Sequence, residues 1–251
     1  MSGHSKWSQI KRQKGVADAR RGQLFTKLAR EIIVVTREGG ANPESNFRLR
    51  LAVQKARDNN MPLENIERAI KKGAGELEEG SFAELTLEGY GPNGVAVMVE
   101  AVTDNRNRTL QEVRSIFSRH GGNLGESGCV SWLFNEKGVI TIDTAGIDVE
   151  ELALYAIDAG AEDVKTEKGY LEVHTQPRDM ERVRKAIEDK GITIVSADVS
   201  LVPKSTVNLD KKAASQTLKL LDKLEDLDEV QRVFSNIDFS ESVLEKLRAL
   251  A

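Results

Sequence analysis

Basic side chains crowd the first thirty positions of the chain, where eight lysines and arginines face one acid, Asp18. A lysine offers a mobile point charge, and an arginine offers a planar fork that can bind phosphate through two hydrogen bonds. Trp7 lies among them and could stack on an exposed base, a contact worth about 1–3 kcal/mol. The residues that we take as candidates for contact with nucleic acid are His4, Ser5, Lys6, Trp7, Lys11, Arg12, Lys14, Arg20, Arg21 and Lys27. The alternative is a solvated terminus whose tryptophan packs on its own domain.

A second basic cluster, Asn105-Arg106-Asn107-Arg108, precedes a helix that the apolar spacing predicts from about Thr109 to His120. Cations at a helix N-terminus oppose the macrodipole, at a cost of roughly 0.3–1 kcal/mol each. A bound phosphate would face both the guanidinium groups and the free backbone N–H groups. The alternative is that Asn107 caps the helix while Asp104 and Glu112 compensate the arginines. Both interpretations stay open at the level of sequence.

Charge is segregated along the chain. Residues 1–75 contain 16 basic and 7 acidic residues, whereas residues 76–251 contain 20 basic and 33 acidic ones, and the whole chain has a formal net charge of −4. One end therefore attracts polyanions while the rest repels them, which orients a bound partner. A nucleic acid is the partner that this distribution indicates.

No reactive constellation is evident in the sequence. The three histidines are dispersed without ligand partners at metal-binding spacing, and His174 is expected on the surface of a strand. The single cysteine, Cys129, sits in an apolar run and is expected to be a buried small hydrophobe. The glycine-rich stretches 89–94 and 121–125 lack the strand-then-helix context of nucleotide-binding loops. We therefore expect no enzyme, no cofactor, no metal and no small-molecule ligand.

The composition is that of a folded chain, with 39% hydrophobic and 30% charged residues. The aromatic content of 5% argues against an extended base-stacking platform. No segment is long and apolar enough to span a membrane, and the N-terminus has no secretory signal pattern, so we expect a cytoplasmic location and no membrane partner.

Helical spacing dominates the first part of the chain. One helix is predicted over 24–38, where Gly39-Gly40 ends it, and a second is predicted to open with Asn42 as its N-cap. A third runs from Pro62 to a C-cap at Gly73. Residues 1–23 should form a short helix or an arm that is ordered on binding. Acidic and glycine-rich residues near 74–81 have the chemistry of a linker.

Strands appear beyond the linker. Strands are predicted at 85–87 and 95–99, joined by a turn, and a buried strand is predicted at 129–134. Residues 138–202 then follow the order βαββαβ, which is the ferredoxin-like arrangement. The rest of the chain is too small to stand alone and should complete the earlier sheet. The predicted fold is therefore multidomain α+β, with a basic helical bundle (1–78), a discontinuous α+β domain (79–136 plus 204–251) and an inserted ferredoxin-like domain (137–203).

Several segments together have the character of a family signature. They are Ser2-Gly3-His4-Ser5-Lys6-Trp7, Gly22-Gln23-Leu24-Phe25-Thr26-Lys27-Leu28, Asn60-Met61-Pro62, Glu88-Gly89-Tyr90-Gly91-Pro92, Thr103-Asp104-Asn105-Arg106-Asn107-Arg108-Thr109 and Gly121-Gly122-Asn123-Leu124-Gly125. These segments resemble those of the YebC/PmpR family, and they occur in the family's order. The resemblance implies three domains, the third inserted in the second, and a non-enzymatic regulator of gene expression. Residues 11–14 are Lys-Arg-Gln-Lys where many members carry Lys-His-Arg-Lys, so charge is kept and a histidine is not.

Three functional hypotheses follow. The first is a nucleic-acid-binding regulator, as members described as DNA-binding transcriptional regulators imply. Within the same class, other members resemble ribosome-associated translation factors that ease synthesis through proline runs, so ribosomal RNA is the alternative partner. The second class is a ligand-sensing or protein-interaction module, for which fold analogy is the only support. An enzyme is the third and least supported class, and nothing in the sequence fixes an oligomeric state.

Overall fold

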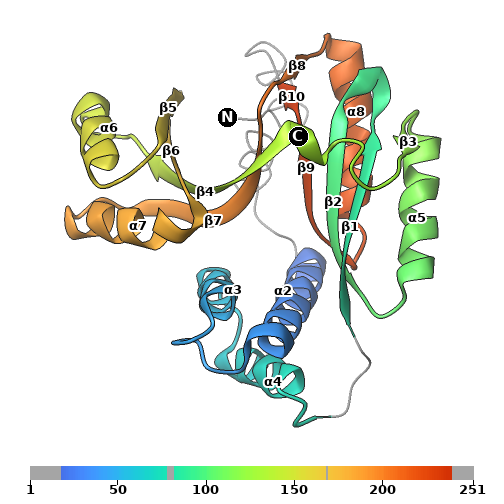
Figure 1. Cartoon of the computed structure of the whole chain (residues 1–251), viewed down its shortest axis with the longest axis horizontal. Coiled ribbons are helices and arrows are strands. Elements are labelled where there is room, and N and C mark those ends of the chain that lie inside the picture. Colours follow the sequence, from blue (N-terminus) through green and yellow to red (C-terminus); the bar gives the residue numbers. More distant parts are fainter. Residues whose placement is uncertain (1–17, 78–81, 168, 239–251) are drawn as a thin grey trace.

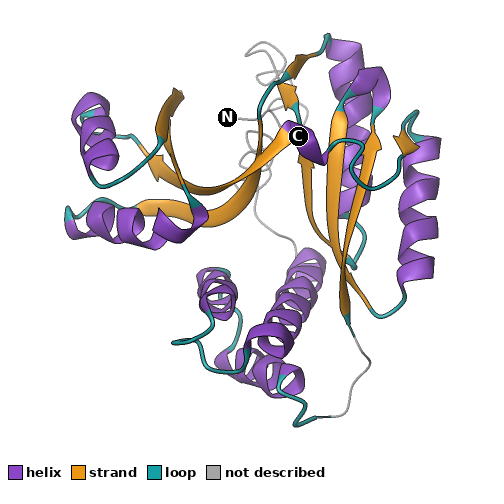
Figure 2. Ribbon diagram, in the orientation of Figure 1, coloured by secondary structure: helices purple, strands orange, loops and turns teal. Residues whose placement is uncertain are grey.

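The computed structural model describes residues 18–77, 82–167 and 169–238, and it shows a multidomain α+β fold, as predicted (Figure 1). Three units surround separate hydrophobic cores: a helical unit, a sheet with two long helices, and a smaller sheet with two short helices (Figure 2). We refer to them as the first, middle and third domains. The chain passes from the middle domain into the third and then returns.

The first domain is a bundle of three helices. They are α2 (Asp18–Gly39), α3 (Phe47–Asp58) and α4 (Leu63–Gly73). Their apolar faces meet in a core that includes the fully buried Leu28, Ile32, Leu49 and Ile66. The predicted stop is confirmed, because α2 ends at Gly39 and Gly40 adopts a positive φ of 89°.

The start of α3 differs from the prediction. Asn42 accepts a hydrogen bond from the Glu44 backbone N–H at 3.0 Å, but it opens only a turn. The N-cap is Asn46, whose side-chain oxygen accepts from the Leu49 N–H at 3.0 Å. The predicted N-cap at Asn42 is therefore wrong by one helical turn. At the other end of the bundle, residues 18–23 are the first turns of α2.

The middle domain is built on an antiparallel sheet with the strand order β3-β1-β2-β9. Its elements are β1 (Ala83–Tyr90), the 3-10 turn η1 (Pro92–Gly94), β2 (Ala96–Thr103), α5 (Arg106–Arg119), β3 (Asn123–Leu124), α8 (Lys211–Glu225) and β9 (Val230–Ser235). Helices α5 and α8 pack on one face through residues such as Val113, Phe117 and Leu221. Two short strands, β8 (Val207–Asn208) and β10 (Ile237–Asp238), pair in parallel beside it. Because β9 pairs with β2, sequence from the end of the chain completes a sheet begun more than a hundred residues earlier.

The third domain has the ferredoxin-like order of elements. They are β4 (Phe134–Asp143), α6 (Val149–Asp158), β5 (Asp163–Glu167), β6 (Tyr170–Thr175), the 3-10 turn η3 (Pro177–Asp179), α7 (Met180–Asp189) and β7 (Ile194–Pro203). All neighbouring strands are antiparallel, in the order β5-β6-β4-β7. Phe134 at the start of β4 lies opposite Pro203 at the end of β7, so the two connections to the middle domain are cross-strand neighbours.

Two local predictions are wrong. Residues 129–134 were expected to form a buried strand, but Ser131–Leu133 form a 3-10 turn, η2, and the Trp132 side chain is 63% exposed. The buried Glu88 carboxylate accepts from the backbone N–H groups of Val130 and Ser131, so these donors are not available to a strand ladder. His174 was expected on the surface but is buried, and its Nε2 has a polar partner there, because it lies 3.0 Å from the Glu172 carboxylate, which is also buried.

Candidate nucleic-acid interface

The N-terminal candidates fall mostly beyond the described part of the chain. His4, Ser5, Lys6, Trp7, Lys11, Arg12 and Lys14 lie outside the described residues. Arg20 lies in the first turn of α2, and Arg21, which follows it, is exposed. Of the N-terminal candidates, only Arg20, Arg21 and Lys27 therefore lie within the described residues.

Lys27 is engaged within the molecule. Its ammonium donates to the backbone carbonyl of Glu225, at the end of α8, with a separation of 2.6 Å. Burial lowers the pKa of Lys27, and the nearby carboxylates of Glu225 and Asp228 offset part of that effect. Gln23, one turn earlier, donates to Asp228 at 3.2 Å. This side of α2 thus packs against the middle domain and is not an open face.

The second cluster begins α5 three residues earlier than the sequence predicted. The helix starts at Arg106, and the N-cap is Asn105, not Asn107, because the Asn105 side-chain oxygen accepts from the Arg108 N–H at 3.1 Å. Thr103 supports the cap, since its hydroxyl accepts from the Asn105 backbone N–H at 2.9 Å. Arg106, Asn107 and Arg108 therefore occupy the first helical turn, and all three are exposed.

Arg108 is engaged within the molecule. Its guanidinium lies 2.7 Å from Asp104 and 3.1 Å from Glu229, and the hydrogen bond to Asp104 is the main reason why its pKa is raised. The alternative in which acidic residues compensate the arginines named Asp104 and Glu112. In the structure Asp104 does pair with Arg108, and the second acid is Glu229. Arg106 forms no ion pair with any described residue. The structure thus brings Asn105 and Arg108 together in a capped, paired helix start and leaves Arg106 and Asn107 facing solvent.

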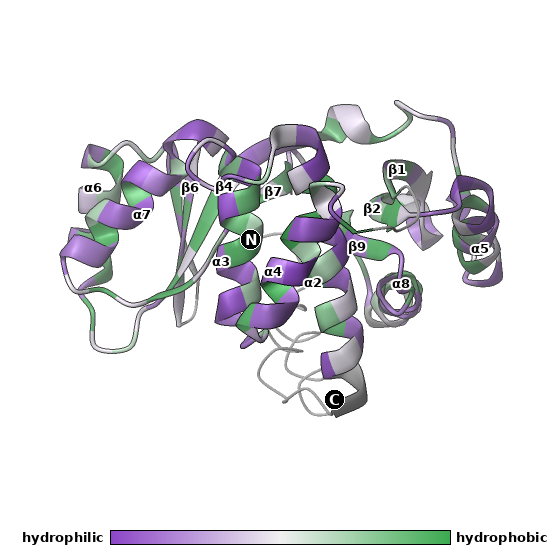
Figure 3. Cartoon of the chain, turned by 90° about the horizontal axis from the view of Figure 1, so that it is seen from below, coloured by the Kyte–Doolittle hydropathy of each residue, from purple (hydrophilic) through white to green (hydrophobic). Residues whose placement is uncertain are grey.

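Further exposed cations occur on the first domain, where sequence reasoning did not single them out. Arg57, Arg68 and Lys71 are exposed, and Arg68 lines a groove of about 220 Å³ between α2 and α4. The floor of this groove is apolar, with Phe25 and Met61 among its lining residues. Figure 3 shows hydrophilic and hydrophobic residues alternating along α4. In the sequence of α4, charged residues alternate with core positions, and this pattern could have indicated its exposed cations.

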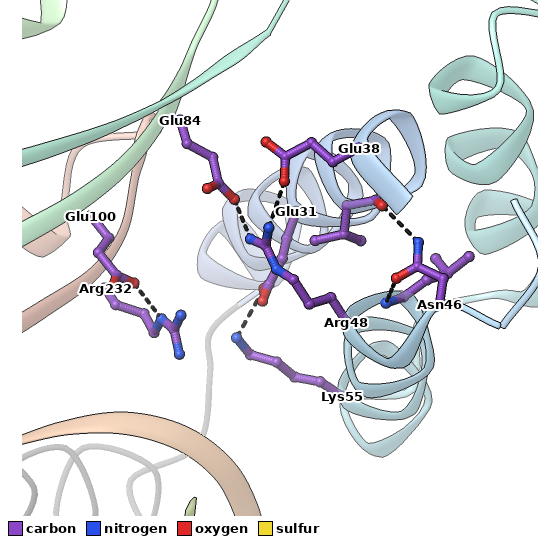
Figure 4. A network of polar contacts seen from close by, with 10 residues as sticks. Glu31, Glu38, Asn46, Arg48, Lys55, Glu84, Glu100 and Arg232 are labelled. Carbon is purple, nitrogen blue, oxygen red and sulfur yellow. Dashed lines mark hydrogen bonds and ion pairs between the residues drawn. The ribbon is translucent and has the colours of Figure 1, made fainter. Parts of the chain in front are cut away.

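A network of charged residues joins the domains (Figure 4). Arg48 of α3 pairs with Glu38 of α2 and with Glu84 of β1, so it spans the first and middle domains. Lys55 pairs with Glu31 at 2.9 Å within the first domain. Although burial raises the pKa of Glu31, the Lys55 ammonium holds it below its ordinary value. Arg48 and Lys55 are therefore paired within the molecule, although the Arg48 side chain is exposed.

Other chemistry is not assembled in the described ranges. Within residues 18–77, 82–167 and 169–238, no group of three or more His, Cys, Asp or Glu could hold a metal ion. Cys129 is half-buried and not fully buried as the sequence predicted. Burial raises the pKa of its thiol, and the Glu88 carboxylate raises it further, so the thiol is protonated at neutral pH. None of the described helices is long and apolar enough to cross a membrane.

Fold and surface together define a class of protein: a three-domain α+β chain whose basic helical domain precedes two acidic ones. The family model described as the TACO1/YebC protein N-terminal domain matches residues 5–76, and the model described as the TACO1/YebC second and third domain matches residues 82–237. The chain belongs to the TACO1/YebC family.

Relatives support this assignment over the whole length. A probable transcriptional regulatory protein of Dehalococcoides mccartyi strain CBDB1 is 60% identical over all 251 residues, covering 100% of both chains. One from Natranaerobius thermophilus is 51% identical and covers 98% of this chain and 99% of its own. The crystal structure of a conserved hypothetical protein from Aquifex aeolicus is 53% identical, with a TM-score of 0.81, and the match covers 89% of this chain and 93% of that one.

Proposed function

We propose that this protein is a non-enzymatic regulator of gene expression that binds nucleic acid through its first domain. The observation that carries the proposal is the charge distribution: the first 75 residues have an excess of nine basic residues, in a chain whose net charge is −4. Relatives that are 51–60% identical over almost their whole length are named probable transcriptional regulatory proteins, which supports the same class.

The contact is made to the phosphate backbone. Lys6, Lys11, Arg12, Lys14, Arg20 and Arg21 form the main surface, and Trp7 contributes a stacking contact. Arg106 and Asn107 add a second contact at the start of α5, where both side chains are exposed in the first helical turn and Arg106 has no ion pair with a described residue. Lys27 is not part of the surface on this proposal, because its ammonium is bonded to Glu225.

The salt dependence of binding tests the arm directly. Replacing Lys6, Lys11, Arg12 and Lys14 with Ala should reduce the slope of log K against log salt by about 0.7–0.9 for each lost phosphate contact. The measurement is a fluorescence-anisotropy titration at several salt concentrations.

A matched control removes the same charge elsewhere. Arg178, Arg182, Lys185 and Lys190 are all exposed on the third domain, and replacing them with Ala changes the net charge equally. This control should leave the slope unchanged. An arm variant whose slope equals that of the wild-type protein would contradict the proposal.

DNA and ribosomal RNA remain the two candidate partners. The exposed residues of α4, which include Glu64, Glu67 and Arg68, form no distinctive base-reading set for a major groove. A binder of backbone and shape suits structured RNA at least as well as an operator. Sucrose-gradient sedimentation separates the two, because a ribosome-associated protein co-sediments with ribosomes at low salt and is released at high salt, whereas an operator-binding protein stays at the top of the gradient.

A further inference from the structure

Two aromatic rings are held rigidly on the surface of the middle domain. Trp132 in η2 is 63% exposed, and Tyr90 at the end of β1 is 39% exposed. The Trp132 indole N–H and the Tyr90 hydroxyl both donate to the Cys129 carbonyl oxygen, at 3.1 and 3.0 Å. Because both bond to one oxygen, the two side chains lie close together. We call Tyr90 and Trp132 the aromatic pair.

The loop beneath the aromatic pair has fixed backbone contacts, although it contains only one short helical turn. The Glu88 carboxylate accepts from the backbone N–H groups of Gly128, Val130 and Ser131 at 2.8–2.9 Å. Although burial raises the pKa of Glu88, these three donors hold it below its ordinary value, so the carboxylate stays charged. The backbone of Gly125 also packs closely against the Cys129 side chain, because a Cβ at position 125 would lie 2.5 Å from the Cys129 sulfur. The rings therefore lose little conformational freedom when a partner binds.

The pair presents an apolar face to solvent. Its polar atoms, the indole N–H and the phenol hydroxyl, are already bonded within the protein, so the rings have no unsatisfied donor with which to read a partner. Lys204 adds a positive charge at the edge, since its ammonium donates to the Trp132 carbonyl at 2.7 Å and is otherwise exposed. A flat π-face beside a cation is suited to a nucleobase with its phosphate.

The size of the surface favours a base over a protein partner. A stable protein interface buries about 800 Å² on each side, with a cluster of apolar anchors at its centre. The other large exposed hydrophobic residues in the described ranges lie on different domains: Leu63 and Leu77 on the first, and Leu154, Ile157 and Val195 on the third. Two rings are enough for one or two bases and too few for such an interface.

We infer that the aromatic pair is a stacking site for an unpaired nucleobase, with Lys204 beside its phosphate. This inference rests on the proposed function and deepens it, because bases inside a duplex are not available for stacking while those in single strands and loops are. The site is far in sequence from the basic arm. It would therefore let the acidic body of the protein contribute to binding mainly through stacking, with Lys204 as the one added positive charge.

The test compares Trp132→Ala with Leu154→Ala, which removes a similarly exposed apolar side chain (69% exposed) from the third domain. The probes are a short oligo(U) RNA, an oligo(dU) DNA of the same length and a blunt DNA duplex. Trp132→Ala should weaken binding to the single strands by about 5- to 150-fold, and leave duplex binding and the salt slope unchanged. Trp132→Phe should retain part of the affinity, and a melting temperature equal to that of wild type shows that the loop is intact. An effect on RNA and DNA alike identifies the base as the ligand, and an effect on RNA alone adds the 2′-hydroxyl.

Tryptophan fluorescence provides a second test. The chain has two tryptophans, so in a Trp7→Phe background Trp132 is the only one, and stacking should quench its fluorescence on titration with either single strand. Affinity of Trp132→Ala equal to that of Leu154→Ala, or a self-association that Trp132→Ala abolishes while binding persists, would overturn the stacking site. That failure differs from failure of the proposed function, in which the wild-type protein binds none of the three probes.

Discussion

Glu88 shows how one side chain can decide a local structure that periodicity misreads. The apolar run around Cys129 has the composition of a buried strand, but Glu88, forty residues earlier, takes the backbone donors of Gly128, Val130 and Ser131. A charged residue in a strand looks like a solvent-facing position in the sequence. Its burial follows only from the tertiary contact, so the outward position of Trp132 could not be predicted.

Replacing Glu88 with Gln should cost about 1–3 kcal/mol of stability at neutral pH, because the amide presents a donor to backbone donors. The native pKa of Glu88 lies below the unfolded value of about 4.3, so its contribution is complete above that value and is lost as pH falls through the native pKa. The gap between wild type and Glu88→Gln, measured by urea unfolding, should therefore narrow below about pH 4.

The exposed Glu136 gives the matched control, since Glu136→Gln alters a carboxylate that faces solvent. Its free energy of unfolding should stay close to wild type at neutral pH. A Glu88→Gln gap that stays constant down to acidic pH would show that the charge of Glu88 is not what stabilises the loop.

At the scale of elements, the helices of the first domain and the βαββαβ order were predictable, because long periodic segments carry a strong signal. Their ends were not. Asn42 and Asn46 are both good N-cap residues by type, and each accepts a backbone hydrogen bond. Asn46 is the cap because its amide also donates to the carbonyls of Val35 and Gly40 at the end of α2, at 2.7 and 2.8 Å. These contacts depend on where α2 lies.

Asn46 should therefore matter more than an ordinary cap. Asn46→Ala removes the cap and also the two hydrogen bonds from the Asn46 amide to α2, so we expect a loss of about 2–3 kcal/mol in thermal or chemical unfolding. Asp148, an exposed cap that accepts from Glu150 and Glu151, is the comparison, and Asp148→Ala should cost about 1 kcal/mol. Equal losses for the two variants would mean that the bonds from Asn46 to α2 add nothing.

For the whole molecule, Arg232 lies where the middle and third domains meet. Its guanidinium donates to Glu100 of β2 at 2.8 Å (Figure 4). It also donates to the Val199 carbonyl of β7 at 2.6 Å and lies 5.6 Å from the centre of the Phe234 ring. The Glu100 carboxylate is the main factor raising its pKa, against the opposing effect of burial. Charge segregation was visible in the sequence, but which charges the protein neutralises for itself was not.

Arg232→Ala should weaken the contact between β9 and β7, at a cost of about 1.5–3 kcal/mol for the lost charged hydrogen bonds. Hydrogen exchange at the amides of β7 around Val199 should accelerate, while α6 and α7 stay protected. Arg178→Ala removes a guanidinium that is 85% exposed and should change neither region. Unchanged exchange in β7 would show that this arginine does not hold the two domains together.

Strands β4 and β7 belong to two cores at once. Phe134 and Leu201 pack on the outer face of the middle sheet, while Ile140, Ile142 and Ala197 of the same strands pack in the third domain. A two-stranded ribbon therefore runs from one hydrophobic interior into the other, with regular pairing from Phe134 to Thr141. Strands β4 and β7 should therefore transmit force between the two domains, so that a force applied to the far end of the third domain produces a torque on the sheet of β1, β2 and β9.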